Sequence, residues 1–165
     1  MATVRHYRHP AGPQRAVLAG SLLGCTIVLH LTRRHWLEML AQAWDTYPLE
    51  GCGLLIGPSG SDRVERFVPI GNEARSSRVY RLDGRQYAAA ALAADRDGLD
   101  IVGVMHSHTH TAAYPSPTDV EEASKPLIPT SWHWVIVSLG WGYPELRSFK
   151  ILDREIAEEP VGLAQ

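Results

Sequence analysis

Cysteine is scarce in this sequence of 165 residues. Only Cys25 and Cys52 occur, and their spacing is not that of a paired structural zinc site or a disulfide framework. We therefore expect neither, and we expect the reducing cytoplasm as the location. A chain of this length can bury a core of its own as a single domain without covalent cross-links.

An excess of charge of one sign is also missing. Lys and Arg number 16 and Asp and Glu number 18, which gives a formal net charge of -2. Recognition of nucleic acid relies on a strongly basic surface, so nucleic acid is not an expected partner. No apolar run is long enough to span a bilayer unaided, and no internal repeat occurs, so no membrane association is expected.

The first 25 residues begin with a polar, basic, proline-containing stretch and continue into AVLAGSLLGC. This composition is typical of a flexible extension. The end of this stretch is similar to a bacterial lipoprotein signal, which is the alternative interpretation. We favour the extension because the apolar character continues past Cys25 into TIVLHL, which the fold needs as a strand. The expected division is an extension over 1–25, a domain over 26–157 and a C-terminal tail over 158–165.

The stretch from His106 to Asp119, HSHTHTAAYPSPTD, has the clearest chemical pattern. It follows DIVGVM, an apolar and β-branched segment that predicts a buried strand. Alternate side chains of a strand share a face, so His106 and His108 can bind one metal ion while Ser107 points away. Asp119, in the first turn of a helix that Ser116 opens, can supply a third ligand. Two imidazoles and one carboxylate leave one coordination position open, as catalytic zinc requires.

Ordinary structure explains parts of this pattern. Ser116 and Asp119, with proline between them, also fit the start of any helix. A His-x-His pair alone occurs often by chance. The conjunction of His-x-His, seven residues and Ser-x-x-Asp behind an apolar strand favours the metal site. His110 continues the alternation and is an alternative ligand, whereas His133, between two tryptophans, is expected to be packed or hydrogen-bonded.

The pattern resembles the JAMM motif of the MPN-plus metallopeptidases, in which a distant glutamate joins His-x-His-x7-Ser-x-x-Asp. Glu50, in YPLEGCGLLIG, stands at the position of that glutamate. The resemblance implies one zinc ion on His106, His108 and Asp119. It also implies that Glu50 handles the proton of the attacking water and that Ser116 stabilises the reacting oxygen. Without the motif, Glu50 would be interpreted as an exposed loop carboxylate.

Further segments are similar, in order, to bacterial members of this family that free cysteine from a ubiquitin-like sulfur carrier. They are GCGLLIGP, SDRVER, PIGNEARS, YRLD, AYPSPTD, ELRS and EEPV. The resemblance implies a cytoplasmic hydrolase of cysteine biosynthesis that cleaves the amide bond after the carrier's C-terminal Gly-Gly. The alternatives are trimming of other C-terminal residues from a carrier and a non-catalytic MPN scaffold. Thr109 departs from the family pattern, in which proline often follows the second histidine. A homodimer is left open.

Hydrophobic periodicity predicts a strand over 26–31 and then a helix that Thr32 caps and that runs to about Thr46. Its expected core stripe consists of Trp36, Leu40 and Trp44, with Leu37 and Ala41. Proline at position 48 ends this helix, and strands over 51–56 and 63–70 follow as an antiparallel pair. NEARSSRVYRLD forms an irregular connection. Its arginines and the next one, at positions 75, 78, 81 and 85, either steer a carboxylate or form solvated surface.

Asp83 caps an alanine-rich helix that ends near Gly98 and precedes the histidine strand. SWHWVIVSL and ELRSFKI then predict two more strands, with Trp132 or Trp134 against the core, and IAEEPVGLAQ is expected to be a tail. The turns near residues 58 and 141 indicate antiparallel pairs. We therefore predict a mixed α/β fold. The MPN resemblance implies the same, with a curved, largely antiparallel sheet and helices on both sides.

Overall fold

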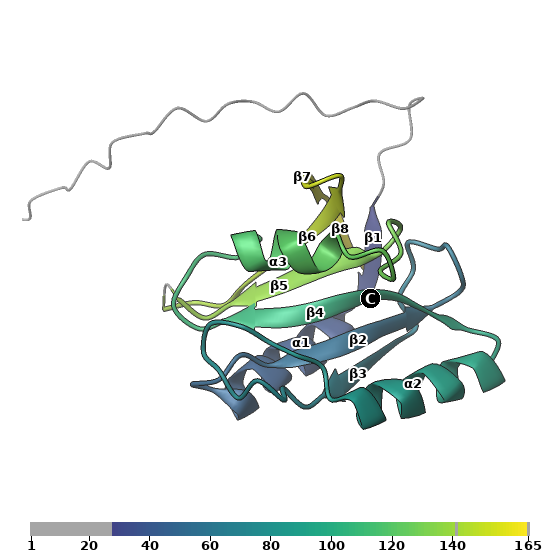
Figure 1. Cartoon of the computed structure of the whole chain (residues 1–165), viewed down its shortest axis with the longest axis horizontal. Helices are drawn as coiled ribbons and strands as arrows, with labels where there is room; N and C mark the ends of the chain where they lie inside the picture. Colours follow the sequence, from purple (N-terminus) through teal and green to yellow (C-terminus); the bar gives the residue numbers. More distant parts are fainter. Residues whose placement is uncertain (1–27, 141, 165) are drawn as a thin grey trace, which may run out of the picture.

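A computed structural model describes residues 28–140 and 142–164 of the chain (Figure 1). The elements follow in the order β1 (Leu29–Thr32), α1 (Arg33–Thr46), β2 (Cys52–Gly57), β3 (Arg66–Ile70), α2 (Gly84–Arg96), β4 (Asp100–His108), α3 (Pro117–Ala123), β5 (His133–Ser138), β6 (Glu145–Leu152), β7 (Glu155–Glu159) and β8 (Val161–Ala164). The expected N-terminal extension and the lipoprotein alternative at Cys25 lie outside the described residues.

Six strands form the main sheet, in the order β3-β2-β4-β5-β6-β7. Only β4 and β5 pair in parallel, and every other neighbouring pair in this sheet is antiparallel. β1 and β8 form a separate two-stranded parallel sheet. The prediction of a mixed, largely antiparallel sheet is therefore confirmed, and β4, which carries the two histidines, is central in it.

Helices cover both faces of this sheet, with α1 behind it and α2 and α3 in front of it in Figure 1. Side chains of α1 pack with Leu55, Met105 and other residues of one face, whereas α2 and α3 pack with Leu54, Val104 and the opposite face. Successive residues of each strand thus supply two cores. Full burial of each large apolar side chain stabilises the fold by about 1.5 to 3 kcal/mol.

Helix α1 begins where it was predicted but is rotated relative to the prediction. The Thr32 hydroxyl accepts a hydrogen bond from the His35 backbone, and the His35 ring accepts one from the Thr32 backbone. Of the expected core stripe, Leu40 packs against the core, but the rest of the prediction is wrong because Trp44 is 54% and Leu37 51% exposed. The buried face of the helix consists of His35, Met39 and Ala43. The small side chain of Ala43 is fully buried on this face, so the helix lies close to the sheet there.

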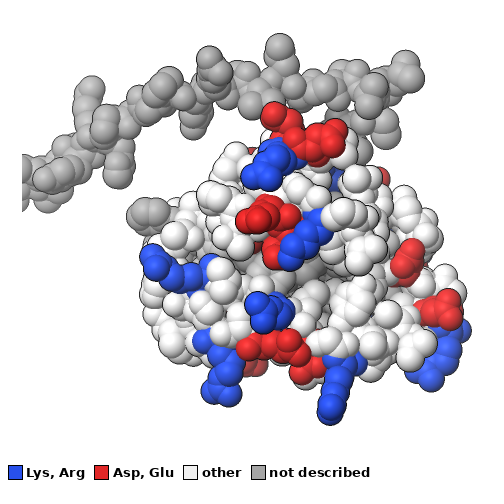
Figure 2. All heavy atoms as spheres, viewed as in Figure 1, with Lys and Arg blue, Asp and Glu red and all other residues white. Residues whose placement is uncertain are grey.

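The C-terminal residues form β7 and β8 in place of the expected tail. β7 adds an edge strand to the main sheet, and β8 pairs with β1 from the start of the described chain. The other predicted elements are present, although β3 begins at Arg66 and not at residue 63. Asp83 caps α2, and Trp132 and Trp134 are buried in the core. On the face seen in Figure 2, basic and acidic side chains are interspersed, as the balanced charge predicts.

Candidate metal centre

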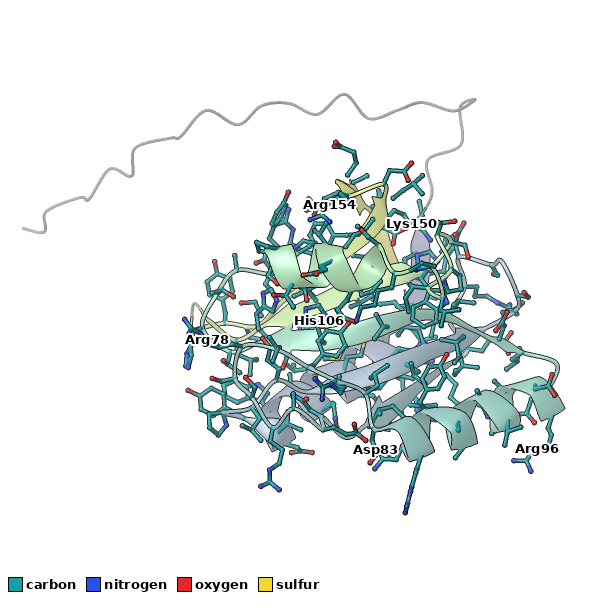
Figure 3. All side chains as sticks on the ribbon, viewed as in Figure 1. Arg78, Asp83, Arg96, His106, Lys150 and Arg154 are labelled. Atoms are coloured by element: carbon teal, nitrogen blue, oxygen red, sulfur yellow. The ribbon has the colours of Figure 1, made fainter. Side chains whose placement is uncertain are left out.

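The two histidines of β4 turn their imidazoles to one place at the carboxyl end of the strand. His106 and His108 are both buried, and their Nε2 atoms are 3.2 Å apart. The Asp119 carboxylate joins them, with Oδ1 3.2 Å from His106 Nε2 and Oδ2 3.5 Å from His108 Nε2. One ligand atom from each residue lies within 4.8 Å of the other two, so this group can hold a metal ion. Figure 3 shows His106 in front of β4, beneath α3.

Asp119 reaches this place because α3 starts with a capping box. The Ser116 hydroxyl accepts a hydrogen bond from the Asp119 backbone at 3.3 Å, and Asp119 Oδ2 accepts one from the Ser116 backbone at 2.7 Å. The helix-start interpretation is therefore confirmed, and it coexists with the approach of the carboxylate to the histidines. Burial alone would raise the pKa of Asp119, but His106, His108 and Ser116 lower it well below its usual value.

The hydrogen bonding of His108 suits a metal ligand. Its Nδ1 is 2.8 Å from the Ala112 carbonyl oxygen, which can only accept, so Nδ1 carries the proton. The Nε2 atom of the neutral ring then presents its lone pair towards His106 and Asp119. Three electron-rich atoms meet in a buried space, and a divalent cation would balance them. The donor set therefore fits a metal ion.

His106 is held in another way. Its Nδ1 is buried and has no hydrogen-bond partner within the described part of the chain. Its ring instead stacks on Tyr80, with the ring centroids 4.5 Å apart and the planes 19° from parallel. Burial raises the pKa of Tyr80 well above its ordinary value, so the phenol stays neutral. Tyr80 thus orients one histidine by packing, whereas Ala112 orients the other by a hydrogen bond.

Glu50 lies opposite the histidines because of the register of β2 and β4. Cys52 pairs with His106, and Gly51 exchanges hydrogen bonds with Ser107: the Gly51 amide donates to the Ser107 hydroxyl, and the Ser107 amide donates to the Gly51 carbonyl, each at 2.8 Å. One residue further along, Glu50 comes beside His108. Ser107, whose side chain points away from the metal centre, therefore fixes the backbone of Gly51 next to Glu50.

The backbone of Glu50 is also held from the other side. Its amide donates to the Ser76 carbonyl at 2.8 Å, and its carbonyl accepts from Asn72 Nδ2 at 3.0 Å. The residue is 5% exposed, which is not the exposed loop carboxylate of the alternative interpretation. Burial is the main cause that raises the pKa of Glu50 to about 7. The charge of His108 opposes this shift, and the charge of Asp119 adds to it. A carboxyl group with this pKa can accept and return a proton near neutral pH.

Sequence reasoning missed Asn72, Tyr80 and Ser107, which hold the groups of the centre in place. Asn72 is preceded by a strand and belongs to PIGNEARS, but an asparagine after a strand is more often part of a turn. No local pattern reports a stack between residues 26 positions apart in the sequence, such as Tyr80 and His106. Long-range contacts of this kind become visible only in the folded chain.

The other two histidines considered from the sequence, His110 and His133, do not belong to the ligand group. His110 is exposed, and its ring makes an edge contact with Tyr47 at a centroid distance of 6.2 Å. His133 is buried and is hydrogen-bonded to Glu159 at 2.8 Å, which confirms the expectation for it. Among the described residues, no helix has both the length and the apolar character needed to cross a membrane.

Comparison with known proteins supports this description. The family described as prokaryotic homologues of the JAB domain matches residues 32–152. A CysO-cysteine peptidase of Mycobacterium tuberculosis is 44% identical over 129 residues, which cover 77% of this chain and 85% of that protein. The solution structure of protein DSY2949 from Desulfitobacterium hafniense is 34% identical, with a TM-score of 0.72, and the match covers 82% of this chain and 92% of that one.

The fold is also found in a more distant protein. A JAB1/MPN domain protein from Archaeoglobus fulgidus is 16% identical and superposes with a TM-score of 0.51, over 79% of this chain and 94% of that one. At this identity the likeness shows the fold alone. The MPN fold and the resemblance inferred from the histidine motif are thereby confirmed, and the chain belongs to the family of prokaryotic homologues of the JAB domain.

Proposed function

We propose that the protein is a zinc-dependent peptidase that hydrolyses the amide bond after the C-terminal Gly-Gly of a ubiquitin-like sulfur carrier and releases cysteine. The observation that carries the proposal is the group of His106, His108 and Asp119 with Glu50 beside it. The name of the CysO-cysteine peptidase, 44% identical over most of this chain, supports the choice of substrate.

Two imidazoles and one carboxylate form one of the ligand sets found at catalytic zinc, which leaves a position for water and substrate. Zinc held by His106, His108 and Asp119 would polarise the scissile carbonyl and lower the pKa of a bound water towards about 7. His108 meets this need with its Nδ1–H on Ala112, which leaves Nε2 as the atom that can bind the metal. No cysteine belongs to the group, which suits a catalytic rather than a structural centre.

Glu50 would move the proton in this reaction. It takes a proton from the attacking water and gives it to the amine of the departing cysteine, so that the carboxyl group returns to its starting state. Its pKa of about 7 allows both transfers at neutral pH, and its backbone contacts with Ser76 and Asn72 fix the backbone from which the side chain projects. Proton transfer by a positioned group of this kind typically accelerates a reaction by about 10² to 10⁴-fold.

The Ser116 hydroxyl lies at the start of α3, where it caps this helix. This hydroxyl accepts a hydrogen bond from the Asp119 backbone, so the hydroxyl proton is still free to donate. We propose that it donates to the carbonyl oxygen as negative charge develops there. Such a donor is typically worth about 10² to 10³-fold in rate, whereas a purely capping serine affects mainly stability.

The test is the intact mass of the Mycobacterium tuberculosis CysO protein, carrying a C-terminal cysteine, after incubation with this protein. We expect the loss of one cysteine, and we expect a zinc chelator to abolish it. The Glu50→Gln variant should bind zinc like the wild type and release cysteine about 10² to 10⁴-fold more slowly. An unchanged mass with zinc bound would contradict the proposal and favour the trimming of longer tails or the scaffold alternative.

A further inference from the structure

Residues 71–85, which comprise the connection between β3 and α2 and the first two residues of α2, carry four exposed arginines. We call this range the arginine segment, and its arginines are Arg75, Arg78, Arg81 and Arg85. Within the described part of the chain, none of their guanidinium groups has a carboxylate within 4.0 Å. Of the seven other arginines that the structure describes, four pair with a carboxylate, namely Arg34, Arg63, Arg66 and Arg147, whereas Arg33, Arg96 and Arg154 do not. The four charges of the arginine segment are therefore left for solvent or for a partner.

The backbone of the arginine segment is held although its side chains are free. The Arg75 amide donates to the Asn72 carbonyl at 3.1 Å, and the Arg81 amide donates to Asn72 Oδ1 at 3.0 Å. The Arg78 amide donates to the Ser76 hydroxyl at 3.1 Å. The guanidinium groups thus extend from an ordered backbone. This order reduces the conformational entropy that is lost when a partner binds them.

The two acidic side chains of the arginine segment do not neutralise it. Glu73 accepts a hydrogen bond from the Gly84 backbone, and Asp83 accepts two from the first turn of α2. One oxygen of each carboxylate is thus bound by backbone amides, and two acidic side chains stand against four arginines. The segment has a positive excess on a chain whose formal net charge is -2.

The arginine segment borders the metal centre at three points. Ser76 accepts from the Glu50 amide at 2.8 Å, and Tyr80 stacks on His106. The Ser77 carbonyl accepts from the Thr109 hydroxyl at 3.3 Å, directly after the second histidine. In Figure 3, Arg78 extends outward at the edge of the molecule while His106 lies inward of it. A protein whose tail enters the centre would therefore meet these arginines with its surface.

We propose that the arginine segment is a docking surface for an acidic face of the carrier protein whose C-terminal tail enters the metal centre. The inference rests on the proposed function and specifies the carrier surface that the enzyme recognises. A guanidinium binds carboxylates in a planar, two-point geometry. The C-terminal tail of the carrier brings only one carboxylate, which can bind one or two arginines. Four arginines spread over eleven residues match the several acidic side chains of a folded surface.

Charges of this kind act mainly on association, and salt screens them. We expect kcat/KM for the CysO–cysteine conjugate of Mycobacterium tuberculosis to fall as NaCl is raised from about 20 to about 300 mM. The double variant Arg78→Glu, Arg81→Glu should raise KM about tenfold or more at low salt and leave kcat within about twofold. A wild-type KM that does not depend on salt, or an unchanged KM in the double variant, would overturn the docking proposal.

The chain offers a matched control. Arg75 and Arg154 are both exposed and have left-handed backbones, with φ of 46° and 67°. Glycine is favoured at this φ, so Arg→Gly removes a charge at either position without backbone strain. Arg154 lies in the turn between β6 and β7, outside the arginine segment. We expect Arg75→Gly to raise KM about threefold and Arg154→Gly to leave it unchanged, with both melting temperatures close to that of the wild type. Equal KM values for the two variants would contradict the assignment.

Two further measurements separate the possible failures. With a short peptide ending in Gly-Gly-Cys, the double variant should match the wild type, and an equal loss on the peptide would mean that the arginines bind the tail carboxylate instead. Calorimetric binding of CysO tests docking even without turnover: weaker binding to the double variant supports the proposal, and equal or absent binding to both proteins overturns it. Wild-type protein that binds CysO but releases no cysteine would contradict the proposed function alone.

Discussion

At the scale of single residues, the metal centre depends on neighbours that do not themselves contact the metal. His108 is oriented by the Ala112 carbonyl and His106 by the Tyr80 ring, so the two ligands are supported by different kinds of contact. Residues that orient ligands typically change metal affinity by about 10 to 100-fold when they are replaced. The stack on Tyr80 is the more informative contact to test, because it can be removed by mutation and the carbonyl cannot.

Replacement of Tyr80 by alanine should weaken zinc binding about 10 to 100-fold, because His106 would lose the packing that holds its ring. Tyr80→Phe keeps the aromatic face and should bind zinc within about threefold of the wild type. Competition with a chromophoric chelator measures both affinities. If alanine and phenylalanine variants bind zinc equally well, the ring of Tyr80 does not position His106.

Zinc affinity should also depend on pH, through groups at the centre. Burial raises the pKa of Glu50 to about 7. For His108, burial lowers the pKa, but the hydrogen bonds to Asp119 and Ala112 raise it overall. A bound cation repels protons from both groups, so binding releases protons that the metal-free protein holds near pH 7. Affinity should therefore fall as the pH is lowered from 8 to 6, by about tenfold per pH unit for each proton released.

Calorimetry of zinc binding in buffers with different ionisation heats counts the protons released. Glu50→Gln removes one titrating group, so this variant should release fewer protons at pH 7 and show a shallower dependence of affinity on pH. A zinc affinity that stays constant between pH 6 and pH 8 in the wild type would contradict the assignment of these groups to the centre.

At the scale of elements, the rotation of α1 decides which of its side chains stabilise the fold. Met39 is fully buried against the sheet, whereas Trp44 lies on the solvent side although its spacing suits a core position. The helix follows its capping box and the close approach of Ala43, not the largest apolar stripe. A periodic pattern limits the buried face of a helix to a few choices, and packing selects one of them.

We expect Met39→Ala to reduce the free energy of unfolding by about 2 to 5 kcal/mol, because it leaves a cavity between α1 and the sheet. Trp44→Ala removes a larger side chain from an exposed position and should change the free energy of unfolding by no more than about 0.5 kcal/mol. Urea unfolding of the two variants gives both values. A larger loss from Trp44→Ala than from Met39→Ala would mean that α1 packs through the stripe predicted from the sequence.

At the scale of the whole molecule, the chain ends of the described domain meet. β8 pairs with β1, and β7 completes the edge of the main sheet, so residues 155–164 belong to the packed domain. The domain boundaries, a cytoplasmic location and a homodimer stay predictions.

Cys52 can be used to probe the packing of the domain, because it lies fully buried on β2 next to β4. Burial, with a smaller contribution from Glu50, raises the pKa of the Cys52 thiol to about 12.

The Cys52 thiol should therefore be unreactive in the native protein and become reactive only when the whole domain unfolds. In a Cys25→Ser background, alkylation at pH 8 should be slower than that of a free thiol by about the unfolding equilibrium constant, on the order of 10³-fold or more. Mass spectrometry of the alkylated protein measures the rate with and without urea. Rapid alkylation without denaturant would indicate that β2 opens locally.

The sequence alone determined the features that depend on short-range order. Alternation along a strand brought His106 and His108 to one face, Ser-x-x-Asp predicted the capping box that carries Asp119, and Asp83 was identified as the cap of α2. These predictions succeed because strand and helix periods and caps are local properties of the backbone. Glu50 is identified only through the resemblance to the JAMM motif, in which a distant glutamate joins the histidines and the aspartate.

Tertiary structure decided the rest. The buried side of α1, the pairing of β8 with β1 and the stack of Tyr80 on His106 all join residues that are far apart in the sequence or depend on how volumes fit together. The near-neutral pKa of Glu50 likewise arises from burial, which the whole fold creates. Several arrangements satisfy the same local pattern, and only the packing of the complete chain selects among them.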